Sequence, residues 1–204
     1  MKILLLKIIK LCILSIFLSS CSAALVMESN DPSTKVNQAR ELLSVNRPIP
    51  AERILREVFE IKPTGARDWT ARGEANVLYA TLIVSEAFTA PVFSKRYKEL
   101  GGKKGIPEKY KEYLKSAEAS YMEADKLLPK NSEFDQSNLW WRLAGVYLRL
   151  GEKSSGCDAL DKSLEFYKLG IKRVPNTVIY MPPAYKDKSY EEMITNEKKL
   201  IQCV

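Results

Sequence analysis

The chain of 204 residues contains no histidine, which narrows the chemistry it can perform. Without histidine there is no Ser-His-Asp or Cys-His catalytic group, no histidine-ligated zinc and no usual proton shuttle near neutral pH. No two cysteines are separated by two residues, so a redox-active dithiol or a cysteine-ligated zinc site is not indicated. Hydrophobic residues make up 46% and charged residues 28%, which is typical of a globular protein with one domain or two small ones.

The familiar catalytic motifs are missing as well, because no GxSxG, HExxH or SxxK sequence occurs. Carboxylate pairs such as Glu191 and Glu192 are present, but such pairs are common on helix surfaces. A helical glycosidase with two catalytic carboxylates stays open, since their separation in space decides the matter, yet the sequence selects no pair. We therefore expect a protein that is not an enzyme and that needs no cofactor or metal.

The N-terminal residues 1–20 have the organisation of a secretory signal peptide. Three lysines precede the apolar run Leu11–Leu18, and the small residues Ser19 and Ser20 follow it, directly before Cys21. The apolar run is too short to cross a bilayer, which takes roughly 20 residues. Residues 1–20 are therefore expected to be removed from a protein that is exported.

The tetrad Leu18-Ser19-Ser20-Cys21 resembles the lipobox of bacterial lipoproteins. The resemblance implies that the thiol of Cys21 is diacylglycerylated, that the chain is cut just before it, and that the new amine receives a fatty acyl chain such as palmitate. Two or three chains hold a protein stably on a membrane. Ser22 stands where an aspartate would favour the inner membrane, so the resemblance places the protein in the cell envelope, on the outer membrane facing the periplasm. The alternatives are an ordinary secreted protein with an incidental cysteine and an uncleaved membrane anchor.

Removal of the signal peptide changes the charge and the cysteine content. Residues 1–20 hold three lysines and no acidic residue, so the net charge falls from +7 to +4, which does not indicate nucleic-acid binding. Cys12 leaves with the signal peptide, and Cys21 takes the lipid. Cys157 and Cys203 remain as a pair in an oxidising compartment and are predicted to form a disulfide. The alternative is two separate buried thiols.

Apolar periodicity, proline and glycine divide the mature chain into helices, with residues 21–33 as a lipidated tether and 34–204 as the folded domain. Asp68 is expected to cap the third helix and Pro107 to start the fourth, after a loop at 101–105. The only candidate strand is short, at 177–181. The predicted helices cover 34–45, 50–61, 68–89, 107–128, 134–150, 157–173 and 188–202, with a short helix within 91–100.

One spacing recurs in three of these helices: a small residue, then a bulky apolar residue, a further apolar or small residue and a proline, separated by 4, 3 and 5 positions. The sets are Ala51, Leu55, Val58 and Pro63; Ala117, Tyr121, Ala124 and Pro129; and Ser163, Tyr167, Gly170 and Pro175. Trp140, Leu143, Ala144 and Tyr147 match the pattern Trp-x-x-Leu-Gly-x-x-Tyr, with alanine in place of glycine. The chain therefore resembles tetratricopeptide repeats, in which these are the signatures of the second and first helices of each unit.

The resemblance implies an all-α fold of stacked antiparallel helical hairpins, about three units with insertions. Residues 90–106 intrude between the helices of the middle unit. An extra seven residues or so are expected around Gly151–Gly156 in the third unit. The alternative is an irregular helical bundle in which the spacing arises by chance.

In tetratricopeptide proteins the first helices line an inner face that binds peptides or partner proteins. The corresponding positions here are Val36, Arg40, Leu43, Asn138, Trp141 and Arg149. Tryptophan and arginine are common interface anchors, so Arg40, Trp141 and Arg149 are the candidate partner-binding residues of this face. Core packing beside Trp140 is an equally good reading of Trp141. Adjacent helical residues point about 100° apart, so one of the two tryptophans should lie at an edge or a groove.

The stretch Lys95–Lys115 is strongly basic, with eight basic and three acidic residues. As a mobile loop around Lys103 and Lys104 it could dock on anionic lipid or on an acidic partner. The alternative is an ordinary solvated surface loop. Gly101–Gly105 is not read as a phosphate-binding loop, since it lacks the required spacing and a following serine or threonine.

Taken together, these patterns predict a lipid-anchored envelope protein that acts as a non-catalytic adaptor or scaffold for envelope protein partners. The alternative is an accessory lipoprotein that holds a small ligand for a transport system. A closed apolar cavity of several hundred Å³ would favour the ligand-binding protein, and an open groove would favour the adaptor. A third reading is a protein that binds lipid surfaces through the basic stretch.

Overall fold

The computed structural model describes residues 29–175, 177, 185 and 187–203, and these are all-α. They form eight α-helices and two short 3-10 helices, and no strand occurs among them. The compact unit is Asp31–Val204. The proposed signal peptide, the lipobox and the expected strand at 177–181 lie outside the described residues, apart from Thr177. The first helix begins at Pro32, because the carboxylate of Asp31 caps it by accepting a hydrogen bond from the backbone N–H of Thr34 at 2.9 Å.

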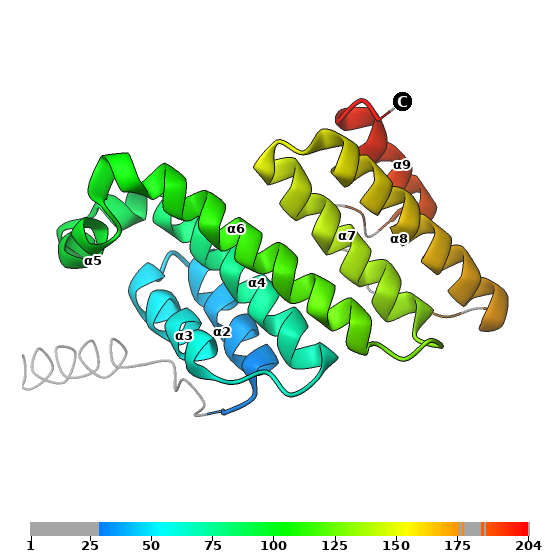
Figure 1. Ribbon diagram of the computed structural model, residues 1–204, viewed down its shortest axis with the longest axis horizontal. Coiled ribbons are helices and arrows are strands. Elements are labelled where there is room, and N and C mark those ends of the chain that lie inside the picture. Colours follow the sequence, from blue (N-terminus) through cyan, green and yellow to red (C-terminus); the bar gives the residue numbers. More distant parts are fainter. Residues whose placement is uncertain (1–28, 176, 178–184, 186, 204) are drawn as a thin grey trace, which may run out of the picture. The chain divides into compact units, whose positions relative to one another are not determined.

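Three helical hairpins follow one another along the chain (Figure 1). They pair α2 (Pro32–Ser44) with α3 (Pro48–Glu60), α4 (Ala66–Ile83) with α6 (Gly102–Leu127), and α7 (Glu133–Leu150) with α8 (Lys153–Arg173). Between hairpins, α4 packs on both α2 and α3, and α6 packs on α7. A last helix, α9 (Tyr190–Leu200), packs on α8.

The small residues of the recurring spacing lie where helices of one hairpin approach each other. Ala51, Ala117 and Ser163 are fully buried. In the middle hairpin Gly73 of α4 faces Tyr121 of α6, and a Cβ on Gly73 would lie only 2.5 Å from the tyrosine ring. The hairpin therefore needs a residue without a side chain at position 73, and Tyr121 fills the space that this leaves.

The extra residues expected around Gly151–Gly156 do not form an inserted loop, so this part of the prediction is wrong. Helix α7 ends at Leu150, Gly151 adopts φ +80° as its C-terminal stop, and α8 begins at Lys153, so the connection is a short turn. The extra residues lengthen the two helices instead of forming a loop. Seven residues make nearly two helical turns, so the same faces stay in contact when the helices grow by this amount.

The segment between α4 and α6 also differs from the expectation. The predicted helix 68–89 ends at Ile83 and is followed by two 3-10 helices, Glu86–Thr89 and Pro91–Phe93, and by α5 (Ser94–Glu99). The rings of Phe88 and Phe93 stack at 4.8 Å between their centroids and are buried, which anchors this excursion. Buried aromatic packing thus replaces the last turns of the expected helix.

Three local predictions in these helices are wrong. Asp68 lies inside the first turn of α4, where its carboxylate accepts the backbone N–H of Thr64, and the N-cap residue is Gly65. The expected loop at 101–105 is the turn that joins α5 to α6, and α6 already begins at Gly102, so Pro107 lies within the helix. Gly101 and Gly102 both have positive φ, a conformation that glycine adopts without strain.

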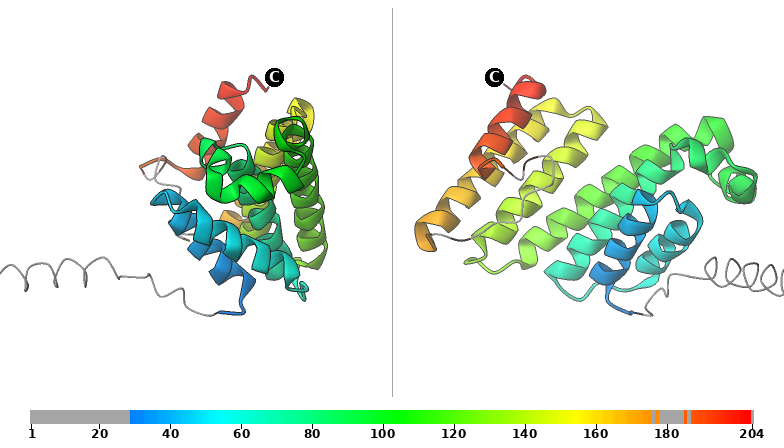
Figure 2. Two further views of the ribbon diagram at one scale, coloured as in Figure 1. Left: turned by 90° about the vertical axis from the view of Figure 1, so that its left-hand side faces the viewer. Right: turned by 180° about the vertical axis from the view of Figure 1, so that it is seen from behind.

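Helix α9 lies against α8 (Figure 2), and side-chain contacts attach both of its ends to the third hairpin. At the start, the hydroxyl of Tyr190 lies 2.7 Å from the hydroxyl of Ser163, and the Tyr190 ring stacks on Tyr167. At the end, a disulfide joins Cys203 to Cys157 in α8, which confirms the predicted pairing. None of the helices in the described part of the chain has the length and hydropathy needed to cross a membrane.

Candidate functional site

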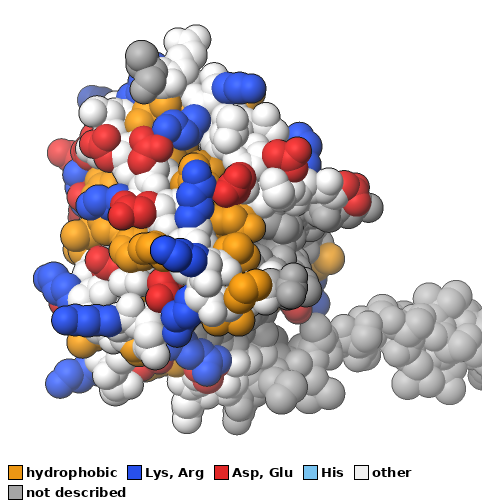
Figure 3. Space-filling model, turned by 90° about the vertical axis from the view of Figure 1, so that its right-hand side faces the viewer, with side chains coloured by type: hydrophobic (Ala, Val, Ile, Leu, Met, Phe, Trp, Pro, Cys, Tyr) orange, Lys and Arg blue, Asp and Glu red, His pale blue; other side chains and the backbone are white. Residues whose placement is uncertain are grey.

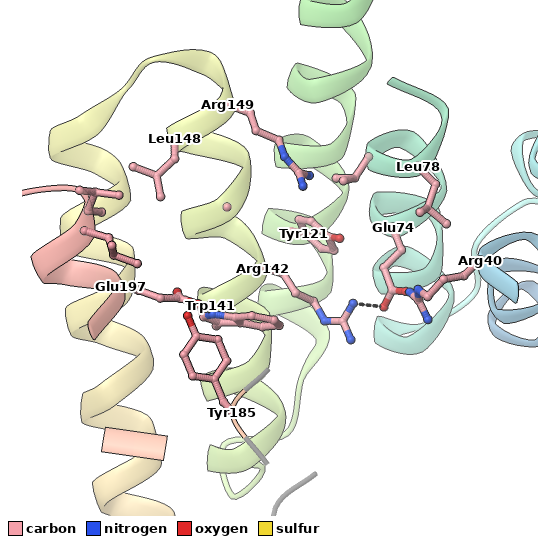
Figure 4. Close-up of a pocket in the computed structure, with 14 residues that line it drawn as sticks. Arg40, Glu74, Leu78, Tyr121, Trp141, Arg142, Leu148, Arg149, Tyr185 and Glu197 are labelled. Atoms are coloured by element: carbon pink, nitrogen blue, oxygen red, sulfur yellow. Dashed lines mark hydrogen bonds and ion pairs between the residues drawn. The ribbon is translucent and has the colours of Figure 1, made fainter. Parts of the chain in front are cut away.

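One face of α7 carries a stripe of residues that opens onto a groove of about 560 Å³ (Figure 4). Helical periodicity explains the stripe, because positions separated by three, four and seven residues share a face. The α7 residues on the groove are Trp141, Arg142, Gly145, Leu148 and Arg149. The opposite face, which includes Leu143 and Ala144, is buried in the core.

The other walls of the groove come from helices α4, α6 and α9. Val77 and Leu78 of α4 line the groove, as do Tyr121 of α6 and residues of α9. Leu78, Tyr121 and Glu197 are labelled in Figure 4. Tyr185, just before α9, packs near Trp141 in the same view. The α9 residues on the groove are Glu197, Leu200 and, just after the helix, Ile201.

The groove exists because the second and third hairpins are joined on one side only. Helix α6 packs against α7, whereas the backbones of α4 and α7 do not pack closely and the two helices are linked by an ion pair between Glu74 and Arg142. The first and second hairpins, by contrast, are in direct contact through α2 and α4. The groove is the space that remains between α4 and α7.

A cluster of three charged residues crosses the floor of this opening. The carboxylate of Glu74 in α4 pairs with Arg40 of α2 on one side and with Arg142 of α7 on the other (Figure 4). Each hairpin therefore contributes one residue. The side chain of Glu74 is 13% exposed and that of Arg142 27%, so this contact is more shielded than a surface ion pair.

A second pocket of about 430 Å³ lies on the other side of the same cluster. Arg40, Glu74 and Arg142 line both pockets. The rest of the second pocket comes from α2 and the first half of α4, with a few residues near the start of α7. The two pockets therefore adjoin each other, with the charged cluster between them.

At the opposite end of the groove, Trp141 and Glu197 join α7 to α9. The indole Nε1 of Trp141 donates a hydrogen bond to Oε2 of Glu197 at 2.9 Å. Burial raises the pKa of Glu197 above its usual value of 4.5, and the hydrogen bond from Trp141 opposes this rise. No cation neutralises Glu197 among the described residues.

Arg149 differs from the other arginines of the groove, because none of the described residues pairs with its charge. It is exposed, it lines the groove, and in the described part of the chain it makes no hydrogen bond or ion pair. Its guanidinium points from α7 towards α4 (Figure 4).

Tyr121 lines the groove. Burial raises the pKa of its hydroxyl, and the nearby Arg142 opposes the rise.

The structure brings together three of the candidate residues and leaves the others apart. Arg40, Trp141 and Arg149 all line the groove, and Trp140 is buried, so the two adjacent tryptophans do divide between core and groove. Lys103 and Lys104 line neither pocket. Of the other positions expected on the inner face, Val36 borders the second pocket, and Leu43 and Asn138 border neither.

The basic stretch is not a mobile loop, because it forms α5 and the first half of α6. Several of its charges are used internally. Arg96 pairs with Glu99 at 2.8 Å and with Glu52 at 3.4 Å, and Lys115 pairs with Glu152 at 2.7 Å. Ordered ion pairs therefore replace part of the free positive charge that the sequence suggested.

Four further residues line the groove and were not predicted from the sequence: Glu74, Arg142, Tyr185 and Glu197. Two of them had a usable signal. Glu74 is the only charged residue in the apolar stretch 73–85, and Arg142 precedes Arg149 by seven residues, so both lie on one helix face. Tyr185 and Glu197 had no such signal, because they depend on how α9 folds back.

Helices α8 and α9 form one end of the molecule. On this end, basic, acidic and hydrophobic side chains are interspersed (Figure 3). Within the described residues there is no group of three or more acidic, cysteine or histidine side chains that could hold a metal ion. No protein-family model, curated protein or solved structure gave a significant match to this chain.

Proposed function

We propose that this protein is a non-catalytic adaptor that binds an extended segment of a partner protein in the groove between α4, α7 and α9. The observation that carries the proposal is the groove itself, which is walled by apolar side chains, has Trp141 on its wall and holds Arg149, which has no partner among the described residues. Apolar clefts with a few polar groups are typical binding sites, and tryptophan and arginine dominate binding energy at interfaces.

The tetratricopeptide-like arrangement is part of this proposal. It is supported by three consecutive hairpins and by the burial of the small residues of the recurring spacing. The close approach of Gly73 and Tyr121 adds to this support. In a tetratricopeptide unit, Gly73 would be the small residue of the first-helix signature and Tyr121 the bulky residue of the second-helix signature. Residues Trp69 and Gly73, four apart, then correspond to Trp140 and Ala144 of the third unit.

The form of the groove favours an adaptor over a small-ligand carrier. The groove opens to solvent, and the second pocket lies next to it across the charged cluster, so an elongated segment that passes over the cluster could contact both. A carrier of a small ligand would gain from an enclosed cavity that removes most of the ligand surface from water. The alternative keeps one point in its favour, because about 560 Å³ is within the usual size range of small-molecule sites.

We place the adaptor on a membrane through a lipid on Cys21, in the cell envelope and on the outer membrane facing the periplasm. The support is the sequence Leu18-Ser19-Ser20-Cys21 after a charged and apolar start. A disulfide between Cys157 and Cys203 is consistent with an oxidising compartment.

Gly145 offers a direct test of the adaptor, because it lines the groove and a Cβ added there meets nothing within 4 Å. We expect Gly145→Phe to fill the groove without disturbing the fold. The full-length, membrane-anchored protein would be crosslinked mildly, purified, and its partners identified by mass spectrometry. The wild type and the Gly145→Ala control should capture the same few stoichiometric partners, and Gly145→Phe should lose them.

Capture that is equal in all three proteins would show that partners bind elsewhere and would contradict the proposal. Native mass spectrometry of the purified chain addresses the alternative. A stoichiometric small molecule that leaves on Gly145→Phe substitution, with no protein partner captured, would favour the ligand carrier.

A further inference from the structure

The charges around the groove indicate which kind of segment it takes. Three arginines and two glutamates line the groove. Glu74 is shared between Arg40 and Arg142, so this group of three carries one positive charge in excess. Arg149 adds a second, and Glu197, the only remaining acid, lies on α9 and accepts the indole N–H of Trp141.

Positive charge therefore gathers on the side of the groove bounded by α2, α4 and the end of α7. Arg149 is the group best placed to use it, because its guanidinium is exposed on the groove and has no partner among the described residues. A guanidinium offers a planar pair of donors that fits a carboxylate in two parallel hydrogen bonds. The apolar residues Leu78 and Leu148 line the same groove and would hold neighbouring side chains of the same ligand.

We propose that the groove selects protein segments in which a carboxylate lies next to bulky apolar side chains, with Arg149 as the carboxylate-binding residue. This inference rests on the proposed adaptor function and names the class of partner segment. The matching chemistry consists of two parts, complementary charge at Arg149 and apolar burial along Leu78, Leu148 and Trp141. A basic segment would be repelled by Arg149 and by the excess positive charge of the Arg40–Glu74–Arg142 cluster.

The test is selection of random peptides displayed on phage against the purified full-length protein. We expect the wild type to enrich peptides with an aspartate or glutamate beside leucine, isoleucine, valine or an aromatic residue. Arg149→Glu should lose these peptides or exchange the acidic residue for a basic one. Arg149→Gln should bind the wild-type peptides roughly tenfold to a hundredfold more weakly, as expected for the loss of one charge-assisted contact.

Lys168→Glu is the matched control, because Lys168 is exposed on α8, lines neither pocket and has no partner among the described residues. It makes the same change of charge as Arg149→Glu and should leave the selection unchanged. Circular dichroism and thermal unfolding of each variant would show that the fold is retained.

The outcomes separate the two proposals. If no peptide is enriched by the wild type, the adaptor function fails, and this inference fails with it. If peptides are enriched without acidic residues, or acidic peptides bind Arg149→Glu as well as the wild type, only the inference is overturned. A dimer of the wild type that Arg149→Glu dissociates in sedimentation would assign the groove to a second copy of the chain and would also overturn it.

Discussion

Trp141 of α7 donates its indole N–H to the carboxylate of Glu197 in α9 at 2.9 Å, and this bond joins the third hairpin to the final helix beside the groove. The carboxylate is half-buried and has no neutralising cation among the described residues. Ionisation of Glu197 is therefore expected to affect the stability of the contact between α7 and α9.

The pKa of Glu197 is raised in the folded protein, so the folded state holds this proton more tightly than the unfolded chain does. The corresponding stability is fully present below the ordinary pKa of 4.5 and is lost as pH rises through the raised value. Glu197→Gln keeps an oxygen that accepts from Trp141 and removes the charge. We expect it to raise the free energy of unfolding at neutral pH and to flatten this part of the pH dependence.

Urea unfolding at a series of pH values from about 4.5 to neutral measures the effect of Glu197→Gln. Glu165→Gln is the control, because Glu165 is exposed on α8 with no partner in the described chain. If the two variants have the same pH dependence, the assigned role of Glu197 is wrong.

Two helical glycines should respond to alanine in opposite directions. Gly73→Ala places a Cβ 2.5 Å from the ring of Tyr121, so we expect a loss of about 1–3 kcal/mol in the free energy of unfolding. Gly145→Ala meets open space in a helix interior and should gain roughly 0.5–1 kcal/mol. Urea denaturation of both variants checks the prediction, and equal signs would contradict the described packing of α4 on α6.

The ion pairs of Glu74 should differ in strength. The side chain of Arg40 is 49% exposed, and that of Arg142 is 27% exposed, so solvent screens the first pair more. We expect Glu74→Ala to cost about 1–3 kcal/mol and Arg40→Ala to cost under about 1 kcal/mol. Double-mutant cycles should give a larger coupling energy for Glu74 with Arg142 than with Arg40. The reverse order would show that the cluster does not join the second and third hairpins.

The disulfide should stabilise mainly the end of α9. Cys157 and Cys203 are separated by 46 positions, and a loop of that length is worth about 3–4 kcal/mol in the chain-entropy model. Met193 and Ile194, in the first half of α9, are buried in the core. Reduction should therefore speed amide exchange first in the last turn of α9. Alkylation of the unreduced protein should leave both cysteines unlabelled, and two added alkyl groups would contradict the disulfide.

The lipid anchor is tested at Cys21, outside the described residues. We expect Cys21→Ser to abolish lipid labelling and to release the protein from the membrane fraction, because the acyl chains supply the stable attachment. Cys12→Ser, within the signal peptide, is the control and should change neither result. Membrane attachment that survives Cys21→Ser would show that the lipobox interpretation is wrong.

Most helices and the disulfide could be predicted from the sequence, because apolar periodicity, proline positions and paired cysteines act locally. The segment 84–101 could not, since the burial of Phe88 and Phe93 ends α4 early and the glycines at 101 and 102 start α6 before Pro107. Here tertiary packing overrides local preference.

Only the part of the groove formed by α7 could be predicted from the sequence. The stripe of Trp141 and Arg149 lies on a single helix, and its periodicity indicates a shared face. Glu197 and Tyr185 join the site only because α9 folds back on the third hairpin, and this depends on Tyr190 and Cys203. Such contacts connect residues that are distant in sequence and leave no periodic trace.

The most direct test of the central claim is photocrosslinking from inside the groove. The residue p-benzoylphenylalanine would replace Leu200, an exposed residue at the groove, in the full-length, membrane-anchored protein, and in a second protein it would replace Leu169, which is exposed on α8. Irradiation from position 200 should give a specific protein adduct that Arg149→Glu removes, and irradiation from position 169 should not give it. The same adducts from both positions, or none from position 200, would contradict a partner-binding groove.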